Sequence, residues 1–269
     1  MQSQVARLPD RLTVEITTRC QGGCVFCNHP GTGEDMSFEN FVKVVELFPS
    51  AKYVHPQGYG EPTLHPKFVK MLKYLRKNDR KAIFYTNGNW KDYFEMIGMA
   101  RATPHKVVFS IDAVTAETYR KLRPRLNFGK AIYWLERFAH LKDKTTKLCV
   151  RWTECKENAH ELPAARKFFK NLGAESFSSV MEAPRGRGNP SKGDHPYACD
   201  RINRHAVVKV NGDVVICCSD WHSEYVIGNV LGDIPVYDTA KFQKIKAEIE
   251  EGTFPLCKVC AAALNRKEA

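Results

Sequence analysis

The hydrophobic pattern of the first 181 residues alternates between two kinds of segment. Short runs rich in β-branched and aromatic residues are separated by longer amphipathic stretches. The runs expected to form strands are Leu12–Thr18, Lys52–Gln57, Lys81–Thr86, Lys106–Asp112, Lys147–Thr153 and Glu175–Met181. The stretches expected to form helices are Ser37–Phe48, Pro66–Lys77, Trp90–Met99, Thr115–Lys121, Phe128–Leu141 and His160–Leu172. This alternation predicts parallel strands joined by crossover helices.

Six β/α units are too few to close an eight-unit barrel. The pattern therefore predicts an α/β fold built as an open, partial (β/α)6 barrel of the TIM type. In parallel folds of this kind, the chemistry lies at the carboxyl ends of the strands.

The composition and the hydrophobic pattern of the chain change after the sixth predicted strand. Residues 182–198 are rich in Gly, Pro and charge, which indicates a linker. Beyond it, Ala206–Val210 and Asp213–Cys217 flank an Asn-Gly pair, which predicts a β-hairpin, and Asp238–Glu250 has a helical pattern. We therefore expect two domains. They are a partial barrel over 1–182, and a linker with a small hairpin-plus-helix domain over 183–269.

Composition restricts the cellular setting and the role of the cysteines. The chain has 269 residues, no apolar run near the ~20 residues of a membrane span, and no signal core at its start. These features predict a cytoplasmic protein. Ten cysteines in a reducing compartment favour metal binding or catalysis over disulfides. Three lie within residues 20–27 and five within 199–260.

The formal charge of +11 favours acidic partners, such as nucleic acid, a phosphorylated substrate or an acidic electron-transfer protein. No long Lys/Arg block is present. Nucleic-acid binding therefore rests on basicity alone, and we do not expect it.

Cys20, Cys24 and Cys27 follow the first predicted strand with C-x3-C-x2-C spacing, and the next cysteine is Cys149. Thiolates suit iron–sulfur clusters or zinc, and a closed site normally has four ligands. Three thiolates around a cubane leave one iron open to a substrate or cofactor. The alternatives are a zinc site completed by His29 or one shared with the distant C-terminal cysteines.

This spacing, within the phrase VEITTRCQGGCVFCNHP, resembles the signature of the radical S-adenosylmethionine (SAM) superfamily. The resemblance implies that a [4Fe–4S] cluster binds SAM through its open iron. It also implies that reduction of the cluster releases a 5′-deoxyadenosyl radical from SAM. Phe26 matches the aromatic residue that shields the cluster in that family.

Further motifs resemble that family in chain order. Gly58-Tyr59-Gly60-Glu61-Pro62 resembles its Gly-Gly-Glu-Pro motif, with Tyr59 in place of the first glycine, and implies contact with the methionine amino group. The remaining positions implied to bind the cofactor are Asn87 after the third strand, Ser110 and Asp112 for the ribose, and Arg151 for a carboxylate. Alternation places Ser110 and Asp112 on one face of their strand. A strand-end Asp that caps the next helix is an equal alternative for Asp112.

The C-terminal cysteines resemble the shortened SPASM extension called a twitch domain. The resemblance implies one auxiliary [4Fe–4S] cluster bound by Cys199, Cys217, Cys257 and Cys260, with Cys218 as a possible replacement for Cys217. A four-thiolate zinc ribbon is the alternative for this segment.

Together these features predict a radical SAM oxidoreductase that abstracts hydrogen from a small molecule, with the auxiliary cluster as electron acceptor. A flavodoxin or ferredoxin would supply the electron that the reaction needs. The first alternative is a peptide maturase or epimerase, in which Cys155 would donate a hydrogen atom, since its parity matches that of Arg151. The second is a zinc-stabilised protein that binds nucleic acid.

Overall fold

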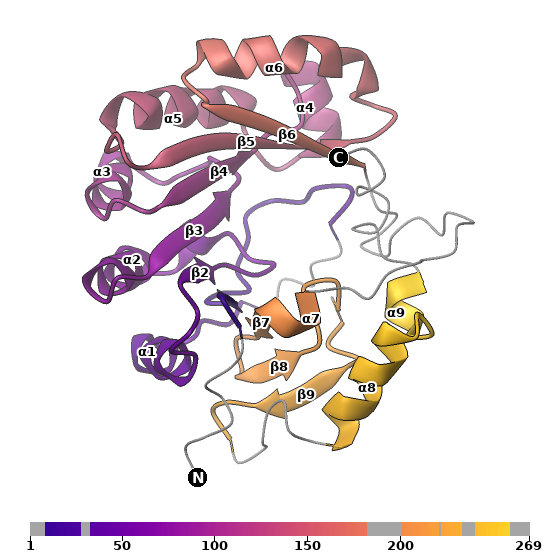
Figure 1. Cartoon of the computed structure of the whole chain (residues 1–269). Coiled ribbons are helices and arrows are strands. Elements are labelled where there is room, and N and C mark those ends of the chain that lie inside the picture. Colours follow the sequence, from indigo (N-terminus) through magenta and orange to yellow (C-terminus); the bar gives the residue numbers. More distant parts are fainter. Residues whose placement is uncertain (1–8, 28–32, 182–200, 221, 233–239, 259–269) are drawn as a thin grey trace.

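The computed structural model describes residues 9–27, 33–181, 201–220, 222–232 and 240–258 (Figure 1). Within the first 181 residues the strands are β1 (Arg11–Val14), β2 (Tyr53–Pro56), β3 (Lys81–Thr86), β4 (Lys106–Ser110), β5 (Lys147–Glu154) and β6 (Ser176–Met181). The helices are α1 (Phe38–Leu47), α2 (Phe68–Lys77), α3 (Tyr93–Arg101), α4 (Ala116–Leu122), α5 (Phe128–Leu141) and α6 (Leu162–Asn171), with short 3-10 turns η2 (Pro62–Leu64) and η3 (Ala159–Glu161).

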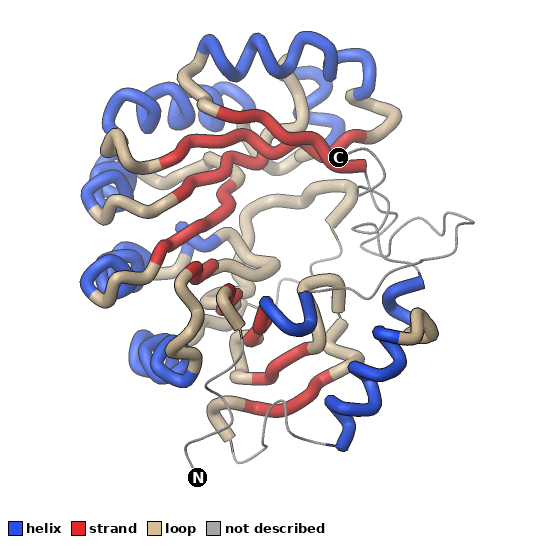
Figure 2. Tube along the Cα trace, in the orientation of Figure 1, coloured by secondary structure: helices blue, strands red, loops and turns tan. Residues whose placement is uncertain are grey.

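The six strands pair in parallel in the order β6-β5-β4-β3-β2-β1. Figures 1 and 2 show the helices ranged along the outside of this curved sheet. Alternate strand residues such as Leu12, Val54, Phe84 and Val150 are fully buried, because they face the helices. Among the described strands the sheet does not close, so the predicted partial (β/α)6 barrel is confirmed.

Helix starts follow the local sequence. Ser37, Asp92, Thr115 and Asn127 each accept a hydrogen bond from a backbone N–H of the first turn of α1, α3, α4 and α5. The cap at Asp92 explains why α3 begins at Tyr93 and not at the predicted Trp90.

Three predicted strands end earlier than expected. β1 ends at Val14, β2 at Pro56 and β4 at Ser110. Just beyond β1 and β4, Glu15 N still donates to Val208 O and Ile111 N to Arg151 O. Farther along, the side chain of Thr17 bonds Asp35 and that of Asp112 bonds Arg123.

The C-terminal part continues the same sheet. It contains α7 (Arg201–Arg204), β7 (His205–Val208), β8 (Asp213–Val215), β9 (Val226–Asn229), α8 (Ala240–Glu250) and α9 (Pro255–Lys258). β7 and β8 form the predicted antiparallel hairpin, and β9 extends it. β7 also pairs in parallel with β1, so the nine strands make one sheet. The sequence pattern did not predict this pairing, and the expected domain boundary near 182 lies outside the described residues.

Among the side chains that link the two parts are two histidines on strands that flank β1. His205 of β7 lies with its ring 5.7 Å from that of His55 on β2, and its Nε2 is 2.8 Å from Oγ1 of Thr13 on β1. No helix in the described part of the chain is long and apolar enough to cross a membrane.

Candidate radical SAM site

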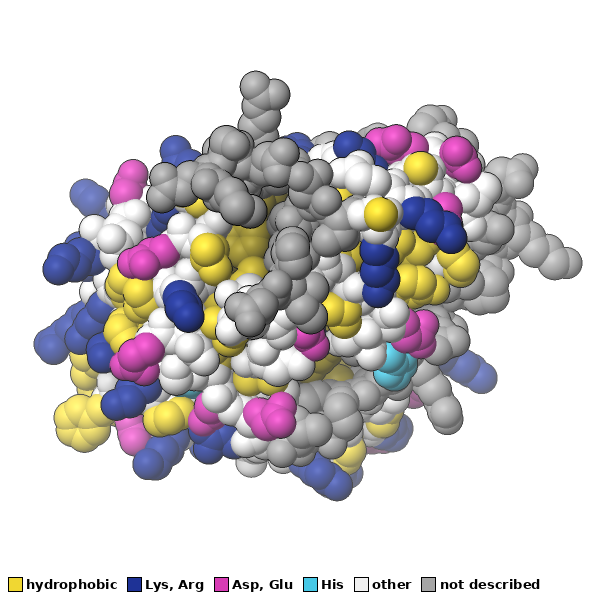
Figure 3. Space-filling model, turned by 90° about the horizontal axis from the view of Figure 1, so that it is seen from below, with side chains coloured by type: hydrophobic (Ala, Val, Ile, Leu, Met, Phe, Trp, Pro, Cys, Tyr) yellow, Lys and Arg dark blue, Asp and Glu magenta, His cyan; other side chains and the backbone are white. Residues whose placement is uncertain are grey.

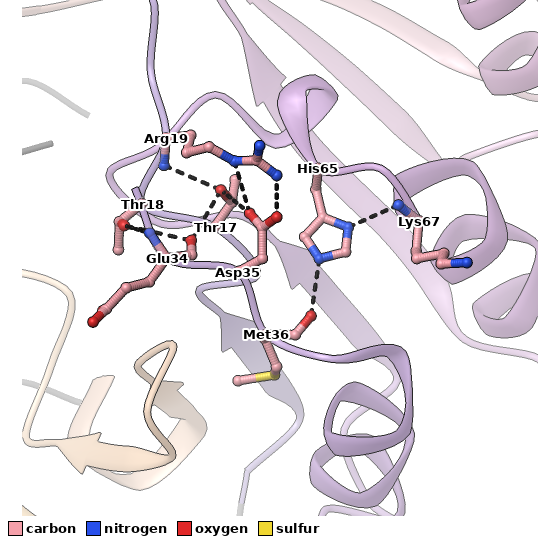
Figure 4. A network of polar contacts seen from close by, with 8 residues as sticks. All are labelled: Thr17, Thr18, Arg19, Glu34, Asp35, Met36, His65 and Lys67. Carbon is pink, nitrogen blue, oxygen red and sulfur yellow. Dashed lines mark hydrogen bonds and ion pairs between the residues drawn. The ribbon is translucent and has the colours of Figure 1, made fainter. Parts of the chain in front are cut away.

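The loop that carries Cys20, Cys24 and Cys27 is closed at its base by a polar network (Figure 4). The backbone N–H of Thr18 donates to Glu34 O at 2.9 Å, and Thr17 Oγ1 donates to Asp35 Oδ1 at 2.6 Å. Arg19 forms an ion pair with the same Asp35. The base of the loop is therefore fixed by side chains that lie outside the cysteine motif itself.

A histidine holds the far side of this base. Lys67 N donates to His65 Nδ1 at 3.0 Å, so His65 Nε2 carries the proton and donates to Met36 O at 2.9 Å (Figure 4). His65 thus connects the chain after the Gly-Glu-Pro turn to the segment that leaves the cysteine loop.

The three thiols lie close enough to influence one another. The pKa of Cys20 is raised to about 11, chiefly by burial and with smaller contributions from the charges of Glu61, Cys24 and Cys27, against a hydrogen bond from Gly22 N that lowers it. Burial also raises the pKa of Cys24, whereas the guanidinium of Arg123 lowers it. Such thiols bind a metal only as thiolates, so cluster binding must release their protons.

Among the described residues, no three His, Cys, Asp or Glu side chains gather closely enough to hold a metal ion. The zinc alternative at these cysteines stays untested by the geometry, and His29 lies outside the described residues.

Glu61 of the Gly-Glu-Pro motif holds two strand ends together. It is completely buried, and its carboxylate accepts hydrogen bonds from Thr63 N, Thr63 Oγ1, Thr86 Oγ1 and Asn87 N. Burial raises the pKa of Glu61, and these four hydrogen bonds act in the opposite direction. Glu61 thus joins the loop after β2 to the loop after β3.

Gly60 is required by the same close packing. A Cβ on this residue would lie 2.3 Å from Thr17 O and 2.8 Å from Arg19 O. The turn that contains Gly60, Glu61 and Pro62 therefore lies directly against the backbone that leads into Cys20.

Two buried amides beside the cysteine loop have unused polar atoms. Asn87 Oδ1 accepts from Asn89 N at 2.9 Å and from Gln21 Nε2 at 3.4 Å. In contrast, Asn87 Nδ2 and Gln21 Oε1 are buried without a partner in the described structure. Since buried polar atoms are normally hydrogen-bonded, these two indicate where a polar ligand such as SAM would lie. The sequence motif did not single out Gln21.

Ser110 and Arg151 lie opposite each other on the paired strands β4 and β5. Both are partly exposed on the side of the sheet that faces away from the helices. In the part of the chain that is described, no carboxylate forms an ion pair with Arg151. The arrangement suits the predicted contacts with a ribose hydroxyl and a carboxylate, which stay predictions.

Asp112 is placed differently from Ser110. It is fully buried, with Oδ2 bound to Arg123 and Oδ1 accepting from Thr153 N at 2.6 Å. Both carboxylate oxygens are therefore used within the protein, and neither caps α4, whose N-cap is Thr115. The ribose role predicted for Asp112 is untested. Arg123, its partner, was not identified from the sequence.

Tyr59, which replaces a glycine of the family motif, lies against the C-terminal hairpin. Its ring centroid is 4.0 Å from Lys209 Nζ, and its backbone N–H donates to Glu15 Oε1 at 3.2 Å. Lys209 also forms a buried ion pair with Glu15. Burial raises the pKa of Tyr59 well above its ordinary value, with smaller effects from Glu15, Cys218, Asp220 and Cys217. Tyr59 therefore lies between the SAM-binding motif and the C-terminal cysteines.

Cys149 and Cys155 are both buried. Cys149 Sγ accepts from Ser176 Oγ at 2.8 Å. Cys155 lies just beyond the end of β5, in a turn where its backbone N–H donates to Asn158 Oδ1, so strand alternation does not determine its direction. Burial raises the pKa of Cys155 to about 11, with a further contribution from its bond to Glu157, so its thiol is protonated at neutral pH.

Two of the predicted auxiliary-cluster cysteines are described, namely Cys217 and Cys257. Ile216 N donates to Tyr225 O, and the Tyr225 ring packs 4.6 Å from Phe254, which precedes Cys257 by three residues. The hairpin end and α9 are therefore joined next to both cysteines. Cys199 and Cys260 lie outside the described residues.

Comparison with known proteins decides the family. The model of the radical SAM superfamily matches residues 14–150, and that of the SPASM iron–sulfur cluster-binding domain matches residues 199–261. The chain belongs to the radical SAM superfamily. These two matches confirm the predicted cofactors, which are SAM and [4Fe–4S] clusters in both parts of this radical SAM chain. They do not test the individual cluster ligands.

The curated relatives have several activities. The chain is 26% identical to a tungsten-containing aldehyde ferredoxin oxidoreductase cofactor-modifying protein of Pyrococcus furiosus, over 62% of this chain and 49% of the relative. It is 26% identical to the subtilosin biosynthesis protein AlbA of Bacillus subtilis, over 67% and 41%. The mycofactocin maturase MftC of Mycobacterium ulcerans is 26% identical over 77% and 57%. This radical SAM chain thus spans about half the length of the curated relatives it matches.

Solved structures show the same fold. SuiB of Streptococcus suis superposes with a TM-score of 0.75 at 14% identity, covering 95% of this chain and 72% of SuiB. BtrN in complex with AdoMet and 2-DOIA gives 0.62 at 16%, covering 95% and 93%. The anSMEcpe structure with AdoMet and the Cp18Cys peptide gives 0.67 at 18%, covering 94% and 88%.

Proposed function

We propose that this chain is a radical SAM oxidoreductase that removes a hydrogen atom from a small organic molecule, with an auxiliary [4Fe–4S] cluster taking up the remaining electron. When bound, the first cluster and SAM supply a 5′-deoxyadenosyl radical. The observation that carries the proposal is the pairing of β1 with β7. This pairing joins the three-cysteine loop and the second cysteine-bearing segment through one sheet.

The residues at the strand ends have distinct tasks in this proposal. Cys20, Cys24 and Cys27 would hold the first cluster, and Asn87 Nδ2 and Gln21 Oε1 would bond polar groups of SAM. Ser110 and Arg151 would fix its ribose and carboxylate. Cys199, Cys217, Cys257 and Cys260 would hold the auxiliary cluster. Glu61 would hold two strand ends together, and its Oε2, which accepts one bond from Asn87 N, would still accept one from the methionine amino group.

The preference for a small molecule is supported by the likeness to BtrN. That structure contains 2-DOIA, and the match covers 93% of BtrN as well as 95% of this chain. The shared length is consistent with a common plan of one barrel and one small cluster-binding extension.

The deciding experiment is anaerobic reconstitution followed by metal, sulfide and product analysis. We expect about eight irons per chain, from two [4Fe–4S] clusters, and 5′-deoxyadenosine when SAM and a reductant are added. Bound zinc without sulfide would refute the proposal.

Substrate class is tested with extracts of cells grown in deuterated medium, separated by size into metabolites and peptides. Transfer of deuterium into 5′-deoxyadenosine from the metabolite fraction supports a small molecule. Transfer of deuterium from the peptide fraction alone excludes a small-molecule substrate.

A peptide maturase is the second candidate, because AlbA and MftC are named for such roles and SuiB and anSMEcpe were crystallised with peptides. Cys155 supplies a specific reason to consider an epimerase. Its protonated thiol retains the S–H bond that a hydrogen-atom donor needs, which a thiolate lacks.

The Cys155→Ala variant tests this role. If the thiol is the donor, the variant forms 5′-deoxyadenosine but no product, as measured by mass spectrometry. Cys149→Ala is the matched control, because its thiol is also buried but lies within β5 and contacts Ser176. Full product formation by the Cys155→Ala variant would exclude Cys155 as the hydrogen-atom donor of an epimerase.

A further inference from the structure

A segment about a hundred residues after the cysteine loop lies directly against it. This segment, Leu122–Leu126, begins at the last residue of α4. Leu122 O accepts a hydrogen bond from Val25 N at 3.0 Å. A Cβ on Gly22 would touch Leu126 at 3.5 Å, and one on Gly23 would touch Arg125 at 3.1 Å. The segment is therefore part of the wall around the first cluster.

Arg123 is the buried member of this segment, with a side chain only 7% exposed. Its Nη1 donates to Cys24 Sγ at 3.4 Å. Its Nε and Nη2 bind Asp112 Oδ2 at 2.6 and 2.5 Å, and its guanidinium lies 5.4 Å from the ring centroid of Phe26. One guanidinium thus touches a cluster cysteine, its aromatic neighbour and the end of β4.

The ion pair of Arg123 and Asp112 is fixed in place by its surroundings. A buried cation is costly without a counter-charge, and Asp112 supplies that charge. Asp112 is in turn fixed by Thr153 N at the end of β5. Arginine suits this place better than lysine, because its planar fork presents separate N–H groups to two acceptors and stays charged at every working pH.

The contact has a consequence for a cluster held by Cys24. Hydrogen bonds to the cluster sulfurs and nearby charge are among the features that set its reduction potential. Reduction adds negative charge, which an N–H donor and a cation next to a thiolate stabilise.

We propose that Arg123 is a positioning residue that fixes the Cys24 thiolate and raises the reduction potential of the SAM-binding cluster. Asp112 is the counter-charge that limits this effect. The proposal rests on the proposed function, since it requires a cluster at Cys20, Cys24 and Cys27. It adds a residue that none of the cluster or cofactor motifs contains.

The test is a potentiometric titration of the reconstituted full-length protein, followed by electron paramagnetic resonance. The signal that changes on addition of SAM identifies the cluster in question. We expect Arg123→Gln to shift its midpoint potential downward, and Arg123→Lys to shift it less, because the charge is kept. Arg120→Gln is the matched control, since Arg120 is exposed on α4, outside the segment that lies against the cysteine loop, and should leave the potential unchanged.

A second variant separates tuning from structural support. Asp112→Asn removes negative charge beside the same arginine, so its potential should shift upward, opposite to that of Arg123→Gln. A merely structural role would not give shifts of opposite sign. If the Arg123→Gln variant loses its iron, the proposal is tested by Asp112→Asn alone. An upward shift of the midpoint potential in that variant then supports the proposal.

If the variants that retain the cluster have the same midpoint potential as the wild-type protein, the proposal is overturned. Absence of any cluster in the wild-type protein would instead overturn the proposed function. The two failures are therefore distinguishable without measuring turnover.

Discussion

At the scale of single residues, the site depends on backbone contacts that leave no room for change. Gly60 has no side chain, and the turn that contains it packs on the carbonyls of Thr17 and Arg19. The glycine belongs to the recognised motif, but the steric reason for it comes from the backbone between β1 and Cys20.

The Gly60→Ala variant is expected to unfold more easily by roughly 2 kcal/mol, because the added methyl overlaps backbone atoms that must then move. It should also bind less iron on reconstitution, since the displaced backbone leads into Cys20. Gly129→Ala in α5 is the control. Its Cβ would meet only Asn127 Oδ1 at 3.4 Å, and it should stabilise the helix by roughly 0.5–1 kcal/mol. Denaturant titration measures both, and equal stabilities would contradict the expectation.

Single residues also show which parts of the site a sequence motif can identify. Cys20, Cys24 and Cys27 were recognisable as candidate ligands from their spacing alone, because all three lie within eight residues. Arg123 was not, because its contact with Cys24 joins positions 99 residues apart. A lone arginine after a helix has no pattern that indicates such a contact.

At the scale of elements, the central feature is the junction of β1, β2 and β7. It holds two partly buried histidines, His55 and His205. Burial lowers the pKa of His55 to about 3, helped by His205, Arg11 and Lys106. Burial likewise lowers the pKa of His205 to about 4, with contributions from Arg201 and Arg11 against Asp10.

These shifts give the fold a defined response to acid. Unfolded histidines titrate near pH 6.5, whereas these two stay neutral in the folded state until about pH 3–4. Between these values, unfolding takes up about two protons through them, so stability falls as pH drops below about 6.5. We expect His205→Gln to reduce this slope by about one proton, as measured by denaturant unfolding at several pH values.

The control for this measurement is His140→Gln, since His140 is exposed in the last turn of α5. Carboxylates contribute equally to the wild type and the variants, so the difference isolates His205. An unchanged slope in His205→Gln would show that the junction does not bury a neutral histidine.

At the scale of the whole molecule, one nine-stranded sheet carries both cysteine groups. The net charge is +11, and Lys and Arg side chains are spread over the face drawn in Figure 3. A positive net charge attracts acidic proteins, which is consistent with a flavodoxin or ferredoxin as the proposed electron donor.

This proposal predicts a salt dependence. Reduction by flavodoxin should slow as ionic strength rises from about 0.01 to 0.15 M, because the Debye length falls from about 30 to 8 Å. Reduction by dithionite, a small chemical reductant, is the control for effects on the cluster itself. Stopped-flow absorbance measures both rates, and a salt-independent rate with flavodoxin would exclude electrostatic attraction of this donor.

The sequence by itself determined the local features. Periodicity predicted six β/α units and the hairpin, because the alternation of apolar residues directly reflects which face of each element is buried. Cysteine spacing indicated the cluster loop, because its ligands are close in the chain. The tertiary structure alone decided the contacts between distant segments. These are the pairing of β1 with β7, Tyr59 against Lys209, and Arg123 between Asp112 and Cys24. Each depends on chain segments that only folding brings together, and no local pattern encodes them.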